Sequence, residues 1–137
     1  MPSSSIDPLN LDFVPINTVT DPKISLVYTN GKEIKHRVHR SFATQWKSAT
    51  AALARAGCVK IVTSGVNNIR PISGTTTMSA HAFGRAIDIN EVLGITMDEA
   101  ANILRNYFVN VLWQVPAHFD HIHANVQYDP NGPIPEL

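Results

Sequence analysis

The stretch Ser79–Asn90 reads Ser-Ala-His-Ala-Phe-Gly-Arg-Ala-Ile-Asp-Ile-Asn, and its second half favours a β-strand. Gly84 precedes this strand, and the absence of a side chain there lets the backbone turn or approach a neighbour closely. Residues two apart in a strand face the same side, so the small Ala86 shares a face with Asp88 and leaves room beside it. A turn at Gly84 would also let His81 converge on Asp88.

A second stretch, His118–His123, reads His-Phe-Asp-His-Ile-His. In a strand, His121 and His123 would point to the same side, and Asp120 would point away unless the strand begins or bulges there. Pro116 and the density of polar residues favour such an irregular start. Together the two stretches offer imidazoles and carboxylates, of which a catalytic zinc site uses three beside an open position for water. The alternative is an exposed, His-rich edge strand near a surface loop.

Apolar periodicity and capping residues predict two helices. The first runs from about Ser41 to Ala56, with apolar residues at intervals of three and four, and Gly57 is placed to end it. Thr96-Met97-Asp98-Glu99 matches a capping box, so the second helix should run from Met97 to about Tyr107. The predicted buried residues are Phe42, Trp46, Ala49, Leu53 and Ala56 in the first helix and Met97, Ala101, Leu104 and Phe108 in the second.

Short apolar or β-rich runs between turn residues predict the strands. Asn30-Gly31 is a strong hairpin signal. Four prolines argue against helix in residues 1–23, which we expect to be an extended arm, and we expect Gly65–Met78 and the tail after Tyr128 to be irregular. The predicted strands are residues 24–29, 33–35 as the return of the hairpin, 59–63, 85–90, 109–115 and 119–126.

This order of elements predicts a small α+β domain spanning residues 1–137, with helices on one face of a mostly antiparallel sheet. A length of 137 residues favours a single domain, and 44% hydrophobic residues suffice for one core. No apolar run approaches the ~18 residues of a transmembrane helix. The N-terminal residues lack the basic start and apolar block of a secretory signal. We expect a monomer that is made in the cytoplasm without a signal peptide.

Charge and cysteine content limit the partners and the metal ligands that this chain can have. Eleven basic and eleven acidic residues give zero net charge, which argues against a nucleic-acid partner because such proteins cluster positive charge. Cys58 is the only cysteine, so an intrachain disulfide and a sulfur-rich zinc site are excluded. Cys58 is expected to be buried at the end of the first helix, as free cysteines often are. Any metal would be held by nitrogen and oxygen, and six histidines make that feasible.

The pattern Ser-x-His-x-x-Gly-x-Ala-x-Asp at 79–88, followed by Asp-His-x-His at 120–123, resembles the zinc D-Ala-D-Ala metallopeptidases. That family includes D,D-carboxypeptidases, D,D-dipeptidases and the L-alanyl-D-glutamate endopeptidases of phage endolysins. Its wider superfamily includes lysostaphin-type enzymes and the hedgehog signalling domain. The resemblance covers about Gly65–Asn125 and includes a Ser-Gly…Arg lead-in at 64–70. It implies a hedgehog/D,D-peptidase-like fold.

The resemblance implies one zinc ion per chain, with His81, Asp88 and His123 as its ligands. Asp120, three residues before the last ligand, would be the general base that takes a proton from the zinc-bound water and passes one to the leaving amine. His121 would donate a hydrogen bond to the transition state. In lysostaphin-type relatives the first His of His-x-His is the base instead, and strand geometry also favours His121 for that role here.

Three further residues are candidates for substrate contact. Arg70 would hydrogen-bond the scissile carbonyl or a substrate carboxylate, although a surface salt bridge is equally open. Ser79 matches the substrate-contacting serine of the family, and it could equally cap a turn. Trp113 is a candidate wall of the substrate pocket, with a core position as the alternative. The other histidines match no motif and are expected to be ordinary surface or partly buried residues: His36, His39 and His118.

The resemblance implies a zinc metallopeptidase that cuts peptidoglycan stem peptides, with L-alanyl-D-glutamate endopeptidase as the first assignment. D-alanyl-D-alanine carboxypeptidase or dipeptidase activity is the alternative, because the shape of the pocket decides between the bonds. By resemblance to phage endolysins, the protein would reach the cell wall through a membrane lesion made by a holin-type partner. A candidate of another class is a non-catalytic zinc-binding or virion structural module. The presence of Asp120 as a base favours the enzyme.

Overall fold

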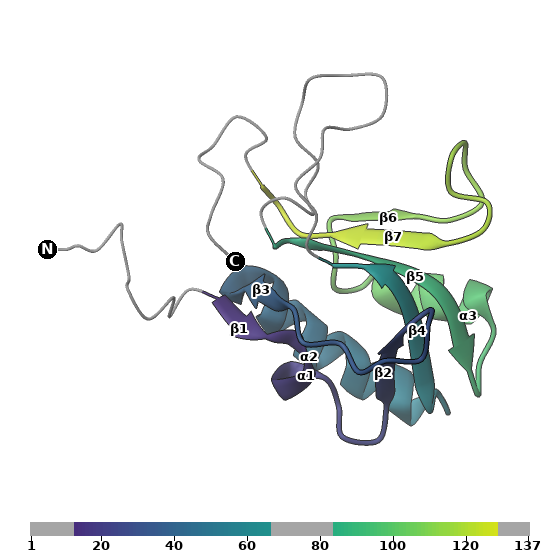
Figure 1. The fold of residues 1–137 in the computed structure, drawn as a ribbon. Coiled ribbons are helices and arrows are strands. Elements are labelled where there is room, and N and C mark those ends of the chain that lie inside the picture. The colour runs from purple at the N-terminus through teal and green to yellow at the C-terminus, as the bar shows by residue number, and fades with distance from the viewer. Residues whose placement is uncertain (1–12, 67–83, 129–137) are drawn as a thin grey trace, which may run out of the picture.

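The structure is a computed structural model, and it describes residues 13–66 and 84–128. In this part of the chain, a sheet of five strands has the order β2-β4-β5-β7-β6 (Figure 1). β2 runs parallel to β4, and every other neighbouring pair is antiparallel. The predicted mostly antiparallel sheet is therefore confirmed. The strands are β2 (Ser25–Tyr28), β4 (Lys60–Gly65), β5 (Ala86–Leu93), β6 (Asn110–Leu112) and β7 (Ile122–Asn125).

The helix α2 (Arg40–Arg55) agrees with the first predicted helix to within one residue at each end. His39 caps its N-terminus by accepting a hydrogen bond from the Ser41 backbone N–H. Gly57, with φ of +109°, follows the last turn as predicted, in a conformation that favours glycine. Most of the predicted stripe is buried, but Ala56 is exposed because it lies beyond the last turn. The buried residues of α2 are Phe42, Ala43, Trp46, Ala49, Thr50 and Leu53.

The helix α3 (Met97–Leu104) begins where the capping box predicts. Thr96 Oγ1 accepts from the Glu99 backbone N–H, and Glu99 Oε1 accepts from the Thr96 backbone N–H, each at 3.1 Å. The helix ends earlier than the predicted Tyr107. The Leu104 carbonyl accepts from the N–H groups of both Tyr107 and Phe108, so the chain leaves the helix through a tight turn. Phe108 nevertheless reaches the core, with 6% of its surface exposed.

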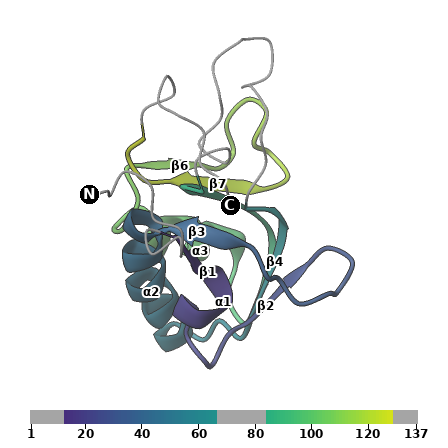
Figure 2. The ribbon, with the colours of Figure 1, turned by 60° about the vertical axis from the view of Figure 1, so that its left-hand side comes forward.

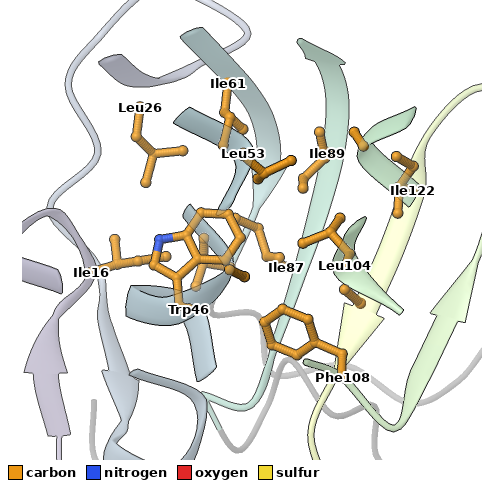
Figure 3. Packing of buried hydrophobic residues seen from close by; sticks show 14 of the residues in the cluster. Ile16, Leu26, Trp46, Leu53, Ile61, Ile87, Ile89, Leu104, Phe108 and Ile122 are labelled. Carbon is orange, nitrogen blue, oxygen red and sulfur yellow. The ribbon is translucent and has the colours of Figure 1, made fainter. Parts of the chain in front are cut away.

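Figure 2 shows the helices beside the sheet from a second direction. One hydrophobic core, drawn as sticks in Figure 3, fills the space between the sheet and the helices α2 and α3. Ile87 and Ile89 of β5 and Ile122 of β7 are fully buried on this side, where they meet side chains such as Trp46 and Leu104. Because side chains alternate along a strand, the residues between them face the other side of the sheet. The helices thus cover one face, and Asp88 and His123 belong to the opposite face.

The expectation of an extended arm without helix is wrong for residues 13–23. β1 (Phe13–Pro15) pairs with β3 (Arg37–His39), and the one-turn helix α1 (Ile16–Val19) follows directly. Proline lacks only an N–H that the start of a helix does not use, so Pro15 can sit at the N-cap. Ile16 is fully buried, which explains why this segment docks instead of extending.

The hairpin after β2 is shorter than predicted. Gly31 has φ of +84°, and Tyr28 accepts from its N–H and donates to the Lys32 carbonyl, as expected for a turn at Asn30-Gly31. The returning segment 33–35 contributes a single bridge between Glu33 and Val27. The chain then leaves the five-stranded sheet and pairs with β1 instead. The predicted irregular loop lies mostly outside the described residues, as do the residues 1–12 of the arm and the tail from 129 onward.

Candidate metal centre

Asp88 of β5 and His123 of β7 lie directly opposite each other in the antiparallel register. Asp88 Oδ1 is 3.1 Å from His123 Nδ1, and the side chains are 11% and 13% exposed respectively. These two predicted ligands are 35 residues apart in the chain, and strand pairing brings them together. The bulged pairing with β4 adds support, because the buried Thr63 hydroxyl donates a hydrogen bond to the Asp88 carbonyl.

The Asp88–His123 pair is compatible with a shared metal ion. Zinc bonds to nitrogen and oxygen of about 2.0–2.1 Å in a tetrahedron place neighbouring ligand atoms roughly 3.3 Å apart. The observed oxygen–nitrogen separation of 3.1 Å is close to that spacing. The third predicted ligand, His81, lies outside the described residues, as do Ser79 and Arg70. Within residues 13–66 and 84–128, no group of three His, Cys, Asp or Glu side chains is arranged to hold a metal.

Asp120 and His121 lie at the rim of this pair, just before β7 begins at Ile122. The irregular start that the sequence predicted for this strand is therefore present. His121 Nδ1 donates to Asp120 Oδ1 at 2.8 Å, and His121 Nε2 is 3.9 Å from Asp88 Oδ1. The His121 hydrogen bond is the main cause that holds the pKa of Asp120 below its usual value. The Asp120 side chain is 90% exposed and that of His121 is 21% exposed, so the imidazole is the more buried of the two groups.

His118, to which the sequence assigned no role, lies beside the site. Its ring centre is 5.0 Å from that of His121 and 5.7 Å from that of His123. A tight turn brings it there, because the His118 N–H donates to the Val115 carbonyl and Ala117 adopts φ of +69°. Proline at the second position of the turn is the one local signal that could have predicted this reversal.

Asn125 is a second residue that the sequence analysis missed. It follows His123 by two positions in β7 and faces the same side, with only 4% of its surface exposed. Its Oδ1 lies 2.8 Å from His123 Nε2 and 3.1 Å from Asn110 Nδ2 of the neighbouring strand. The spacing His-x-Asn within a predicted strand was the available signal, since it places the two side chains on one face.

Trp113 directly follows β6 and lies close to the start of α3. Its indole Nε1 donates to Asp98 Oδ1 at 2.6 Å, and its ring packs against the hydrophobic core. Asp98 belongs to the first turn of α3, on the helix-covered side of the sheet. The indole N–H of Trp113 is therefore engaged on the side opposite to Asp88 and His123. Its role as a pocket wall stays a prediction.

Comparison with known proteins adds no relative: no protein-family model matches the chain, and no curated protein matches it either. Among the described residues, no helix has the length and apolar character needed to cross a membrane.

Proposed function

We propose that the protein is a zinc-dependent peptidase that cleaves peptidoglycan stem peptides, with L-alanyl-D-glutamate endopeptidase as the preferred activity. The observation that carries the proposal is the pairing of Asp88 with His123 across β5 and β7, with Asp120 and His121 at its rim. Asp88 of the first motif and His123 of the second, 35 residues apart in the chain, thus lie on one face of the sheet. The hedgehog/D,D-peptidase-like fold is part of this proposal.

The donor set fits zinc, because one carboxylate and one imidazole already face each other and His81 would be the third ligand. Bound there, zinc would supply a Lewis acid that polarises the scissile carbonyl and lowers the pKa of a water molecule. Asp120, whose pKa is lowered, is ionised near neutral pH and can accept a proton from the attacking water. It would then return a proton to the leaving amine.

His121 has two possible roles beside Asp120. As a hydrogen-bond donor it would stabilise the negative charge that develops on the carbonyl oxygen. Alternatively, Asp120 would orient His121 through the 2.8 Å hydrogen bond at Nδ1, and the Nε2 atom nearer Asp88 would be the base. The role of His121 as a donor follows the family resemblance. Its role as the base is supported by the 3.9 Å distance between His121 Nε2 and Asp88 Oδ1. Arg70 and Ser79 complete the proposal as substrate contacts.

The test is incubation of purified sacculi with the zinc-loaded protein, followed by mass spectrometry of the released fragments. Endopeptidase action exposes the amino group of D-glutamate, whereas carboxypeptidase action releases free D-alanine. Asp88→Asn should abolish release, and Glu91→Gln, an exposed change on the same strand, should not. A folded, zinc-loaded protein that releases neither product from several wall types would contradict the enzyme assignment and favour the non-catalytic module.

A further inference from the structure

We propose that Asn125 is a positioning residue that fixes the tautomer of His123, with the proton on Nε2 and the lone pair of Nδ1 turned toward Asp88 and the metal. The inference concerns the metal site of the proposed peptidase and therefore rests on that proposal for the identity of the ion. Asn125 is almost completely buried.

Two hydrogen bonds determine which end of the Asn125 amide is the oxygen. Its Nδ2 donates to the Val126 backbone carbonyl at 2.9 Å, a contact that only the NH2 group can make. Its Oδ1 receives a hydrogen bond from Asn110 Nδ2 of β6 at 3.1 Å. The atom of Asn125 that faces the imidazole is therefore an acceptor.

The tautomer of His123 follows from that assignment. His123 Nε2 lies 2.8 Å from Asn125 Oδ1, and since the oxygen can only accept, Nε2 must carry the proton. A histidine that binds a metal is neutral, so when the ion is bound the other nitrogen, Nδ1, presents a lone pair. Nδ1 lies 3.1 Å from Asp88 Oδ1, so in that state the two atoms can share one cation.

Asn125 also acts against a competing state. Without an acceptor at Nε2, the imidazole could place its proton on Nδ1 and donate it directly to Asp88, which would occupy the two atoms that the metal needs. Metal-binding histidines typically donate their second ring N–H to a carbonyl or carboxylate, and loss of such a partner costs 10–100-fold in metal affinity. We expect that loss for a variant without the acceptor.

The experiment compares zinc dissociation constants, measured by competition with a chromophoric chelator, in two variants of Asn125. Asn125→Leu has a similar size but no acceptor, and it should weaken zinc binding by about 10–100-fold. Asn125→Asp keeps an acceptor for Nε2 but loses the donor to the Val126 carbonyl, so it should weaken zinc binding less than Asn125→Leu does. Asn102→Leu, a change on α3 away from the site, is the matched control. Thermal unfolding of the metal-free proteins separates loss of fold from loss of metal.

Long-range ¹⁵N NMR of the zinc-loaded protein gives a readout that a purely structural role would not change. It should show His123 protonated at Nε2 and bonded to the metal through Nδ1. Parent-like zinc affinity of Asn125→Leu, or zinc on Nε2, would overturn the inference. If the affinities follow the expected order but sacculi are not cleaved, the peptidase assignment fails alone. If sacculi are cleaved and Asn125→Leu binds zinc normally, the role of Asn125 fails alone.

Discussion

Asp120 and His121 are adjacent in sequence and joined by a 2.8 Å hydrogen bond, yet they differ in exposure, at 90% and 21% of the side chain. If Asp120 is the base, Asp120→Asn keeps zinc and fold but loses ~10²–10⁴-fold or more in cleavage rate, because the amide cannot accept a proton. His121→Ala should cost less, because it would remove only a donor. Rates of stem-peptide cleavage by the zinc-loaded variants test whether Asp120→Asn loses more activity than His121→Ala.

The two variants distinguish which residue is the base by the size of their losses in cleavage rate. A severe loss in His121→Ala with a mild loss in Asp120→Asn would assign the base to His121, as in the lysostaphin-type arrangement. If both variants bind zinc and neither loses cleavage rate, neither residue takes part in catalysis. Asn102→Leu again serves as the control, because Asn102 lies on α3 and contacts Arg105.

Cys58 is buried, with 1% of its surface exposed, three residues after the last residue of α2, and the sequence predicted this burial. Burial raises the pKa of its thiol, which lowers the fraction of reactive thiolate. We expect negligible alkylation by iodoacetamide in the native protein and rapid alkylation in denaturant, measured by mass spectrometry. Cys58→Ser should leave cleavage largely intact. Loss of cleavage in a folded, zinc-loaded Cys58→Ser protein would reveal a role for the thiol.

His36 gives the protein a predicted pH dependence of stability. Burial lowers its pKa below the usual 6.5, and its ring lies within 2.9 Å of the Tyr28 hydroxyl. Below pH 6.5 the unfolded chain binds a proton that the folded chain resists, so this histidine lowers stability as pH falls. The stability advantage of the parent over His36→Gln should therefore shrink between pH 7.5 and 5.5 in urea unfolding. A constant difference across that range would contradict this account.

At the scale of secondary-structure elements, the end of α2 meets the end of β5 through two glycines. Gly94 has φ of +99°, and a Cβ there would overlap the Gly57 carbonyl oxygen, which belongs to the turn after α2. Gly94→Ala should therefore cost the strain of a left-handed conformation, about 1–2 kcal/mol, plus the displacement of a backbone segment. Chemical denaturation would measure the difference.

Gly31 in the turn after β2 is the matched control for Gly94. It has φ of +84°, but a Cβ there would meet nothing within 4 Å. Gly31→Ala should therefore cost only the conformational term of about 1–2 kcal/mol. Equal losses in the two variants would show that the close approach of the two turns contributes nothing to stability.

At the scale of the whole molecule, a metal held by Asp88 and His123 would cross-link β5 and β7 and would bind the folded state. Zinc at 100 times its dissociation constant should raise the free energy of unfolding by about 2.7 kcal/mol. Metal analysis after dialysis should find one zinc per chain. His81→Ala, Asp88→Ala and His123→Ala should each empty or weaken the site, and Glu91→Ala should not. Full occupancy in any of the first three would remove that residue from the ligand set.

The sequence by itself determined the features that depend on near neighbours in the chain. The capping box at Thr96, the apolar stripe of α2 and the turn at Gly31 are each set by residues within a few positions. His121 and His123 both approach Asp88, as the sequence predicted, but His121 precedes β7, so strand alternation alone does not place it. Capping hydrogen bonds and side-chain periodicity depend only on residues within that range, so they can be predicted without knowledge of the fold.

Only the tertiary structure decided which distant segments meet. The docking of Ile16 and the pairing of β1 with β3 depend on burial against a core that the local pattern of prolines does not reveal. The approach of His118, and the contact of Asn125 with His123 and Asn110, depend on the order and register of β5, β7 and β6. Register is a long-range property, because every strand must satisfy its partners on both sides at once.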